Sequence, residues 1–136
     1  MPDTHQIKQT KDAVDLINNQ KPRPIDIKFL QKTGILTVIF DTDEQFEMSA
    51  EYLRVHSPSA EVRGHGAGQE VLQIGKKDVM IINIDPVGNY GVKLVFNDGH
   101  ASGIYSWDTL YELGINQALY WQNYLQRLEK AGIKRD

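Results

Sequence analysis

The chain has 136 residues, of which 40% are hydrophobic and 24% are charged, and its formal net charge is −3. This is the length and composition of one globular domain that buries its own core. The sequence has no cysteine, which excludes disulfides, thiolate metal sites and cysteine nucleophiles and fits a reducing compartment. The acidic charge and the lack of a basic cluster argue against a nucleic-acid partner. No segment approaches the roughly 18 apolar residues of a membrane span, and the first ten residues hold no apolar signal core, so we expect a cytoplasmic protein without membrane contacts.

The polar N-terminal segment ends at Lys21-Pro22-Arg23-Pro24, a sequence that restricts the backbone and is typical of a boundary. We therefore predict a mobile tail over residues 1–23 and a single domain over residues 24–136.

The first structured unit is predicted from its alternation. Ile25, Ile27 and Phe29 alternate with polar residues, which indicates a half-buried strand, and the β-branched run 36–40 predicts a more central one. Gly34 ends the turn between them, where a positive φ is expected. After a turn at 41–44 and a strand over 45–48, Ser49 is placed to cap a short helix over 50–55.

The same order of elements returns 56 positions later, where Phe96 matches Phe40. Residues 92–96 are predicted as a strand, 97–99 as a turn and 100–105 as the returning strand. Ser106 is then placed to cap a helix over 107–113. Between the two units, residues 70–74 and 79–84 are predicted as strands joined by a turn.

The C-terminal region has the pattern of an amphipathic helix over 116–131, capped by Asn116 and stopped by Gly132. Its apolar stripe is expected to lie across one face of the sheet; the stripe comprises Ala118, Trp121, Leu125 and Leu128. The predicted fold class is α+β, a mostly antiparallel sheet built from hairpins, with short capped helices and this C-terminal helix.

No arrangement typical of catalysis is found. The glycine-rich stretch 62–68 does not open a helix after a strand, as a dinucleotide-binding sequence does. The histidines stand in no H-x-D or H-E-x-x-H pattern, and Ser57 beside His56 is no catalytic triad. We predict neither catalytic residues nor a cofactor. One alternative stays open, because His56, His65 and His100 would share a pocket if the later hairpin folds over the 56–68 loop.

Arginine, tyrosine and tryptophan are the residues that most often dominate protein interfaces. Residues of these types lie near the glycine-rich loop and in the second unit, so we predict a binding surface there. The alternative is that the aromatic residues pack the helices against the sheet. The candidate surface comprises His56, Arg63, His65, Tyr90, Tyr105 and Trp107.

Three segments in order resemble the stand-alone bacterial members of the gamma-butyrobetaine hydroxylase-like N-terminal domain family. They are SAEYLRVHSPSAEVRGHG, VLQIGKKDVMI and DPVGNYGVKLVFNDGHASGIYSWDTLYELG. The resemblance implies a small α+β domain. In the hydroxylases this domain precedes a catalytic domain that uses iron and 2-oxoglutarate, which we do not find here. The domain also occurs fused to iron–sulfur cluster carriers, so the resemblance implies an accessory role beside such a carrier or an oxygenase.

The same resemblance indicates a lost metal site. The hydroxylase domains hold structural zinc through three cysteines and a later histidine. The matching positions here are Ser57, Ser59 and Val62 in place of the cysteines, and His100 for the histidine. Because neutral hydroxyl groups and a valine do not hold zinc, we expect a polar network of Ser57, Ser59 and His100 in its place, with Pro58 restricting the turn.

The sequence therefore predicts a non-catalytic accessory domain that binds a protein. The first alternative is a metal- or small-molecule-binding enzyme that uses His56, His65 and His100 with Glu61 or Asp98. The second is a regulatory subunit of an iron–sulfur cluster carrier.

Overall fold

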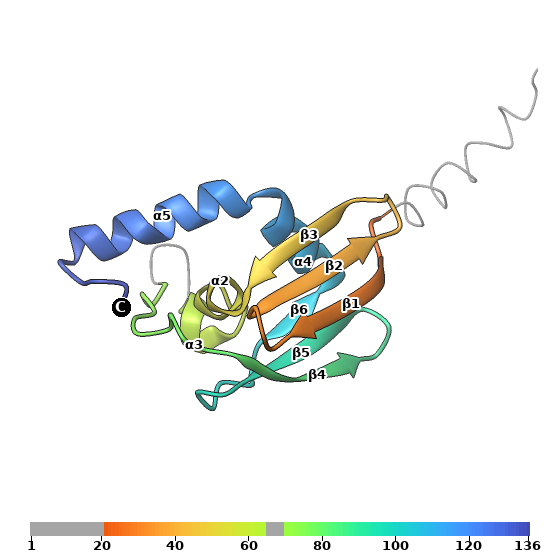
Figure 1. The fold of residues 1–136 in the computed structure, drawn as a ribbon, viewed down its shortest axis with the longest axis horizontal. Helices are drawn as coiled ribbons and strands as arrows, with labels where there is room; N and C mark the ends of the chain where they lie inside the picture. Colours follow the sequence, from red (N-terminus) through yellow and green to blue (C-terminus); the bar gives the residue numbers. More distant parts are fainter. Residues whose placement is uncertain (1–20, 65–69) are drawn as a thin grey trace, which may run out of the picture.

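The computed structural model describes residues 21–64 and 70–136, and these form two three-stranded antiparallel sheets with helices packed around them (Figure 1). The first sheet has the order β1 (Pro24–Leu30), β2 (Ile35–Phe40) and β3 (Gln45–Ser49), and the second has β4 (Ile81–Val87), β5 (Gly91–Phe96) and β6 (Ile104–Ser106). The helices are α2 (Ala50–Val55), α3 (Ala60–Arg63), α4 (Trp107–Ile115) and α5 (Gln117–Lys130). The predicted α+β class is confirmed.

The two units repeat one plan, a three-stranded meander followed by a serine-capped helix. Ser49 Oγ accepts a hydrogen bond from Tyr52 N at 3.0 Å, and Ser106 Oγ accepts one from Thr109 N at 3.1 Å. In each sheet the register shifts near the start of the first strand, as a bulge does. The recurrence predicted for two strands and a helix is thus present, and it extends to a third strand.

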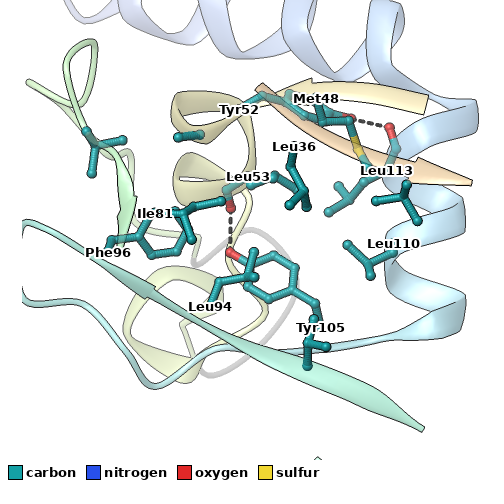
Figure 2. Close-up of a cluster of buried hydrophobic side chains, with 14 of the residues drawn as sticks. Leu36, Met48, Tyr52, Leu53, Ile81, Leu94, Phe96, Tyr105, Leu110 and Leu113 are labelled. Atoms are coloured by element: carbon teal, nitrogen blue, oxygen red, sulfur yellow. Dashed lines mark hydrogen bonds between the residues drawn. The ribbon is translucent and has the colours of Figure 1, made fainter. Parts of the chain in front are cut away.

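Both units contribute to one core, in which two tyrosine hydroxyl groups cross from one unit to the other (Figure 2). Tyr52 Oη on α2 donates to Leu113 O on α4 at 2.6 Å, and Tyr105 Oη on β6 donates to Leu53 O on α2 at 2.6 Å. Both carbonyls lie near the end of a helix, where no helical N–H is available to them. Each unit therefore satisfies a helix end of the other, and burial raises the pKa of both tyrosines.

Residues 70–74, predicted as a strand, form none, and β4 begins at Ile81 rather than at Val79. The backbone of this segment bonds to helix α3 and to a side chain of α5 instead of a neighbouring strand: Val71 N donates to Val62 O at 2.8 Å, and Tyr124 Oη donates to Gln73 O at 2.7 Å. The strand predicted over 100–105 is also shorter, because only its last residues pair with β5.

Helix α5 forms as predicted but packs differently. It lies over α2 and residues 70–74 rather than across a sheet (Figure 1), with Trp121, Tyr124 and Leu128 facing Val55 and Leu72. The predicted stripe was wrong at two positions, since Ala118 and Leu125 are exposed.

The ends of α5 also differ from the prediction in part. Asn116 makes no side-chain cap and instead donates to Glu112 O at 3.0 Å. Gly132 follows the end of α5 as predicted, and its backbone is left-handed, with a φ of 68°.

The predicted N-terminal tail lies mostly outside the described residues. Its last part is tied to the domain, because Arg23 N donates to Asp41 Oδ1 at 3.2 Å and Arg23 Nη2 donates to Asn89 O at 3.3 Å. Within the described ranges, none of the helices has the length and apolar character needed to cross a bilayer.

The packing of α4 on β3 gives a first prediction. A methyl group at Gly114 would overlap the Phe46 ring, so Gly114→Ala should destabilise the fold by about 1–3 kcal/mol. In an exposed helix the same substitution is stabilising by about 1 kcal/mol, because alanine has the higher helix propensity. Urea unfolding measures the loss. In a double-mutant cycle with Phe46→Leu, the cost of Gly114→Ala should fall, and an unchanged cost would contradict the overlap.

Candidate functional site

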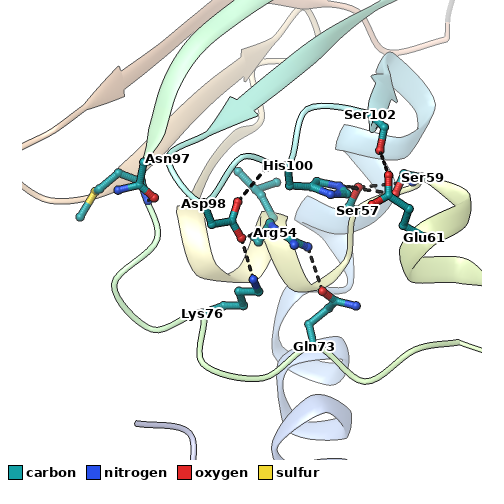
Figure 3. Close-up of polar contacts among 12 residues, drawn as sticks. Arg54, Ser57, Ser59, Glu61, Gln73, Lys76, Asn97, Asp98, His100 and Ser102 are labelled. Carbon is teal, nitrogen blue, oxygen red and sulfur yellow. Dashed lines mark hydrogen bonds and ion pairs between the residues drawn. The ribbon is translucent and has the colours of Figure 1, made fainter.

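The loop after α2 is organised around the His100 imidazole (Figure 3). Ser57 Oγ and Ser59 Oγ lie 2.8 Å and 3.4 Å from His100 Nε2, and Ser59 N donates to Ser57 Oγ at 3.3 Å. All three residues are buried. Gly103 lies directly against the Ser57 hydroxyl, where a Cβ atom would overlap it. The polar network expected of Ser57, Ser59 and His100 is therefore present in the structure.

A second polar group holds His100 in place from the other side. His100 N donates to Asp98 Oδ1 at 3.1 Å, and Asp98 Oδ2 accepts from Arg54 Nε at 2.8 Å and from Lys76 Nζ at 2.7 Å (Figure 3). Arg54 Nη1 also donates to Gln73 Oε1 at 3.0 Å. The turn 97–99 is thereby fixed to α2 and to residues 73–76.

Burial and charge set the ionisation of this group. Burial lowers the pKa of His100, and the nearby Arg54 guanidinium lowers it further. Burial opposes ionisation of Asp98, but hydrogen bonds from Lys76, His100 N–H and Arg54 outweigh it and lower the pKa of Asp98 to about 2. At neutral pH the site thus holds a neutral imidazole beside an ionised carboxylate.

A cleft of about 500 Å³ opens beside this network, between α2, α3, α4 and α5. We call it the His56 cleft. His56 Nδ1 lies 2.8 Å from Tyr52 O, and its ring stacks on Tyr120 with a centroid distance of 5.9 Å. Burial lowers the pKa of His56, so the imidazole in the cleft wall is neutral at pH 7.

Two arginines stand at the edge of the His56 cleft. Arg63 and Arg127 are exposed and line it. Arg127 Nη2 donates to Glu70 O at 3.3 Å. Within the described part of the chain, no hydrogen bond of the Arg63 guanidinium is formed. The lining of the cleft thus combines two arginines with aromatic rings, and it also includes the carboxylates of Glu70 and Glu112.

The residues proposed as one binding surface fall into separate places. His56 and Arg63 line the His56 cleft, while Tyr90 and Trp107 line a smaller cleft of about 270 Å³ that shares no lining residue with it. The second cleft also contains Arg23, Asn89 and Asp108, and Trp107 Nε1 donates to Asn89 O at 2.8 Å.

Two further members of the predicted surface stand differently. Tyr105 is fully buried in the core, where its hydroxyl is bonded to Leu53 O, so its prediction as a surface residue was wrong. Aromatic content alone did not distinguish a core tyrosine from an exposed one. His65 lies outside the described residues.

The metal alternative finds no geometric support in the part of the chain that is described. Residues 21–64 and 70–136 contain no group of three His, Asp or Glu side chains placed to hold an ion. His56 and His100 are bonded to different groups, and Glu61 Oε1 accepts from Ser102 Oγ at 2.8 Å. Val62, the remaining position of the zinc frame, is buried at the edge of the His56 cleft.

The residues of the His56 cleft that were not predicted as site residues include Tyr120, Tyr124 and Arg127 of α5. They stand at i, i+4 and i+7 on α5, so they share one helix face. The shared face could have been predicted from that spacing, but its position over α2 could not.

The comparisons with known proteins agree with this fold. A family model described as gamma-butyrobetaine hydroxylase-like, N-terminal, matches residues 27–111. The chain belongs to this family. No curated protein matches it.

Solved structures of similar chains extend the match. Two solution NMR structures are 51% and 44% identical, each over 85% of this chain and 86% and 90% of theirs, with a TM-score of 0.74 in both cases. A crystal structure of a protein of unknown function in the DUF971 family, from Acidithiobacillus ferrooxidans, is 30% identical over 68% of this chain and 92% of its own, with a TM-score of 0.57. The family assignment expected from the three sequence segments is confirmed.

The lowered pKa of His100 gives a prediction for stability. In the unfolded chain His100 takes up a proton near pH 6.5, whereas in the folded chain its lowered pKa delays protonation to a lower pH. The contribution of the neutral His100 to stability is therefore fully present above pH 6.5 and is lost as the pH falls below it. The free energy of unfolding should decrease between pH 7.5 and 5.5, and less steeply in His100→Gln. Because the pKa of His56 is lowered in the same direction, histidine NMR titrations separate the two. A His100 pKa at or above 6.5 would contradict the buried, neutral ring.

Proposed function

We propose that this domain is a non-catalytic accessory module that binds a partner protein through the His56 cleft. The observation that carries the proposal is the division of polar groups around that cleft. The groups with the chemistry for catalysis, His56, His100 and Asp98, are bonded to the fold. The lining of the cleft includes two arginines and two tyrosines, residue types that favour binding, beside the carboxylates of Glu70 and Glu112.

The two arginines at the edge of the cleft are the groups that would bind an acidic segment of the partner. Arg63 and Arg127 lie on the rim, and Tyr120 Oη already donates to Glu112 Oε2 at 2.6 Å, so this lining carboxylate has a partner of its own. A guanidinium binds a carboxylate through two parallel hydrogen bonds, which gives orientation as well as energy. The aromatic wall behind the arginines supplies apolar area.

The family supports an accessory role beside an enzyme or carrier. An iron–sulfur cluster carrier or an oxygenase in the cytoplasm is the partner class that we propose, and a regulatory effect on cluster transfer by such a carrier is the second candidate. A cluster-transfer assay with and without this protein distinguishes regulation from simple association.

We further propose that the 57–62 loop is a zinc site that has lost its metal. In a tetrahedral site, Zn–S bonds of about 2.3 Å and Zn–N bonds of about 2.0 Å place sulfur and nitrogen roughly 3.5 Å apart. Ser59 Oγ lies 3.4 Å from His100 Nε2, close to that separation, whereas Ser57 Oγ lies at 2.8 Å, within direct hydrogen-bond distance.

Binding at the cleft can be tested with a matched set of variants. The double variant R63A/R127A should lose a partner that wild type captures from cytosol, because both rim charges are gone. Lys28→Ala removes another exposed charge, on β1 and outside the three clefts, and should retain that partner. Quantitative mass spectrometry of affinity-purified complexes gives the readout. Equal capture by all three proteins, or none above background, would refute the proposal.

The lost metal site predicts a gain of function. The triple variant S57C/S59C/V62C should bind one Zn²⁺ with a Kd below roughly 1 μM, since three thiolates and one imidazole make a closed tetrahedral site. Removing the fourth ligand with His100→Ala should weaken that binding. Metal analysis of untagged wild type is the control; stoichiometric zinc or iron there would favour the metal-dependent enzyme instead.

A further inference from the structure

On the other side of the contact between α2 and α5 lies a cavity of about 420 Å³, which we call the Glu51 cavity. Glu51 stands in the first turn of α2, and its side chain is only 4% exposed. A carboxylate held this far from water requires a cationic partner, because removing the partner would leave an uncompensated buried charge. The cavity is therefore built around a fixed anion.

Arg135 supplies the partner in a geometry specific to guanidinium. Arg135 Nε lies 2.9 Å from Glu51 Oε2, and Arg135 Nη2 lies 2.7 Å from Glu51 Oε1, which is the two-pronged arrangement of an arginine on a carboxylate. The guanidinium carbon also lies 5.3 Å from the centre of the Trp121 ring. A planar cation that bonds through its edge and stacks through its face is an arginine and not a lysine.

Arg135 is held less firmly in the fold than Glu51 is. Glu51 belongs to a helix that is buried throughout, whereas the Arg135 side chain is 42% exposed. The segment carrying Arg135 reverses direction at Gly132 and is anchored mainly by Ile133. Its other ion pair, Lys77 to Asp136, is long at 3.7 Å and exposed, so it contributes little.

We propose that Glu51 and Trp121 form a binding site for an arginine side chain, which Arg135 occupies within the chain and an arginine of a partner protein takes by displacing it. The site is separate from the His56 cleft, since the two share no cationic residue and no aromatic one. It would hold even if nothing bound at that cleft.

The test uses full-length Arg135→Ala and the probe N-acetyl-arginine amide, followed through the tryptophan indole N–H signals in NMR. Trp121 should shift on addition of the probe and reach saturation. Trp107, whose indole is already bonded to Asn89 O, should not shift and serves as the internal reference. The lysine analogue of the probe should bind at least about tenfold more weakly, because it lacks the fork and the stacking.

Two comparisons make the result decisive. Wild type should bind the probe at least about tenfold more weakly than Arg135→Ala, because Arg135 competes at high effective concentration. The variant R135A/E51Q should not bind it. No saturable Trp121 shift in Arg135→Ala, or an equal shift in R135A/E51Q, would overturn the proposal.

If Arg135→Ala does not fold, R135K keeps a cation beside Glu51 but loses the fork. It should then bind the arginine probe more tightly than wild type, and equal affinity would also overturn the proposal.

Discussion

Helix α2 has no side that faces water, and the rest of the structure depends on how its polar groups are paired. All six of its residues are buried, although two of them, Glu51 and Arg54, are charged. A helix buried all round is normally apolar, and each buried charge requires a partner. The partners come from distant parts of the chain, Arg135 for Glu51 and Asp98 for Arg54. The short helix thereby fixes the C-terminal segment and the later hairpin at once.

The repeated plan of the two units explains where these partners come from. Each meander delivers its chain into a serine-capped helix, and each helix end is completed by a tyrosine from the other unit. The 97–99 turn of the second unit then meets the loop that leaves α2 in the first. His100 and Ser57 are thus brought together where the second meander packs against α2, and their hydrogen bond closes the same junction that Arg54 and Asp98 close beside it.

The sequence predicted what is decided locally. Ser49, Ser106 and Gly34 mark helix starts and a turn through their own backbone chemistry, and strand alternation reflects burial on one face. What depends on distant packing was missed. Residues 70–74 have strand-like composition, but their backbone groups are taken by Val62 and Tyr124. Tyr105 looked like an interface residue because nothing local reveals that its hydroxyl completes a helix 52 positions earlier in the chain. The His100 network was predicted because the family frame, unlike composition, pairs distant positions.

The two clefts on either side of the α2–α5 contact differ in chemistry, and this bears on how the domain would work. The His56 cleft opens with two arginines, whereas the Glu51 cavity is built on a carboxylate. Their walls include Glu51 in the first turn of α2, His56 directly after its last residue, and different flanks of α5. Binding at one cleft is linked to binding at the other only if each ligand favours one placement of α5 on α2; the same placement gives positive coupling and different placements give negative coupling. Because α2 is fixed by pairing on all sides, α5 with residues 132–136 is the element whose position a ligand in either cleft would bias.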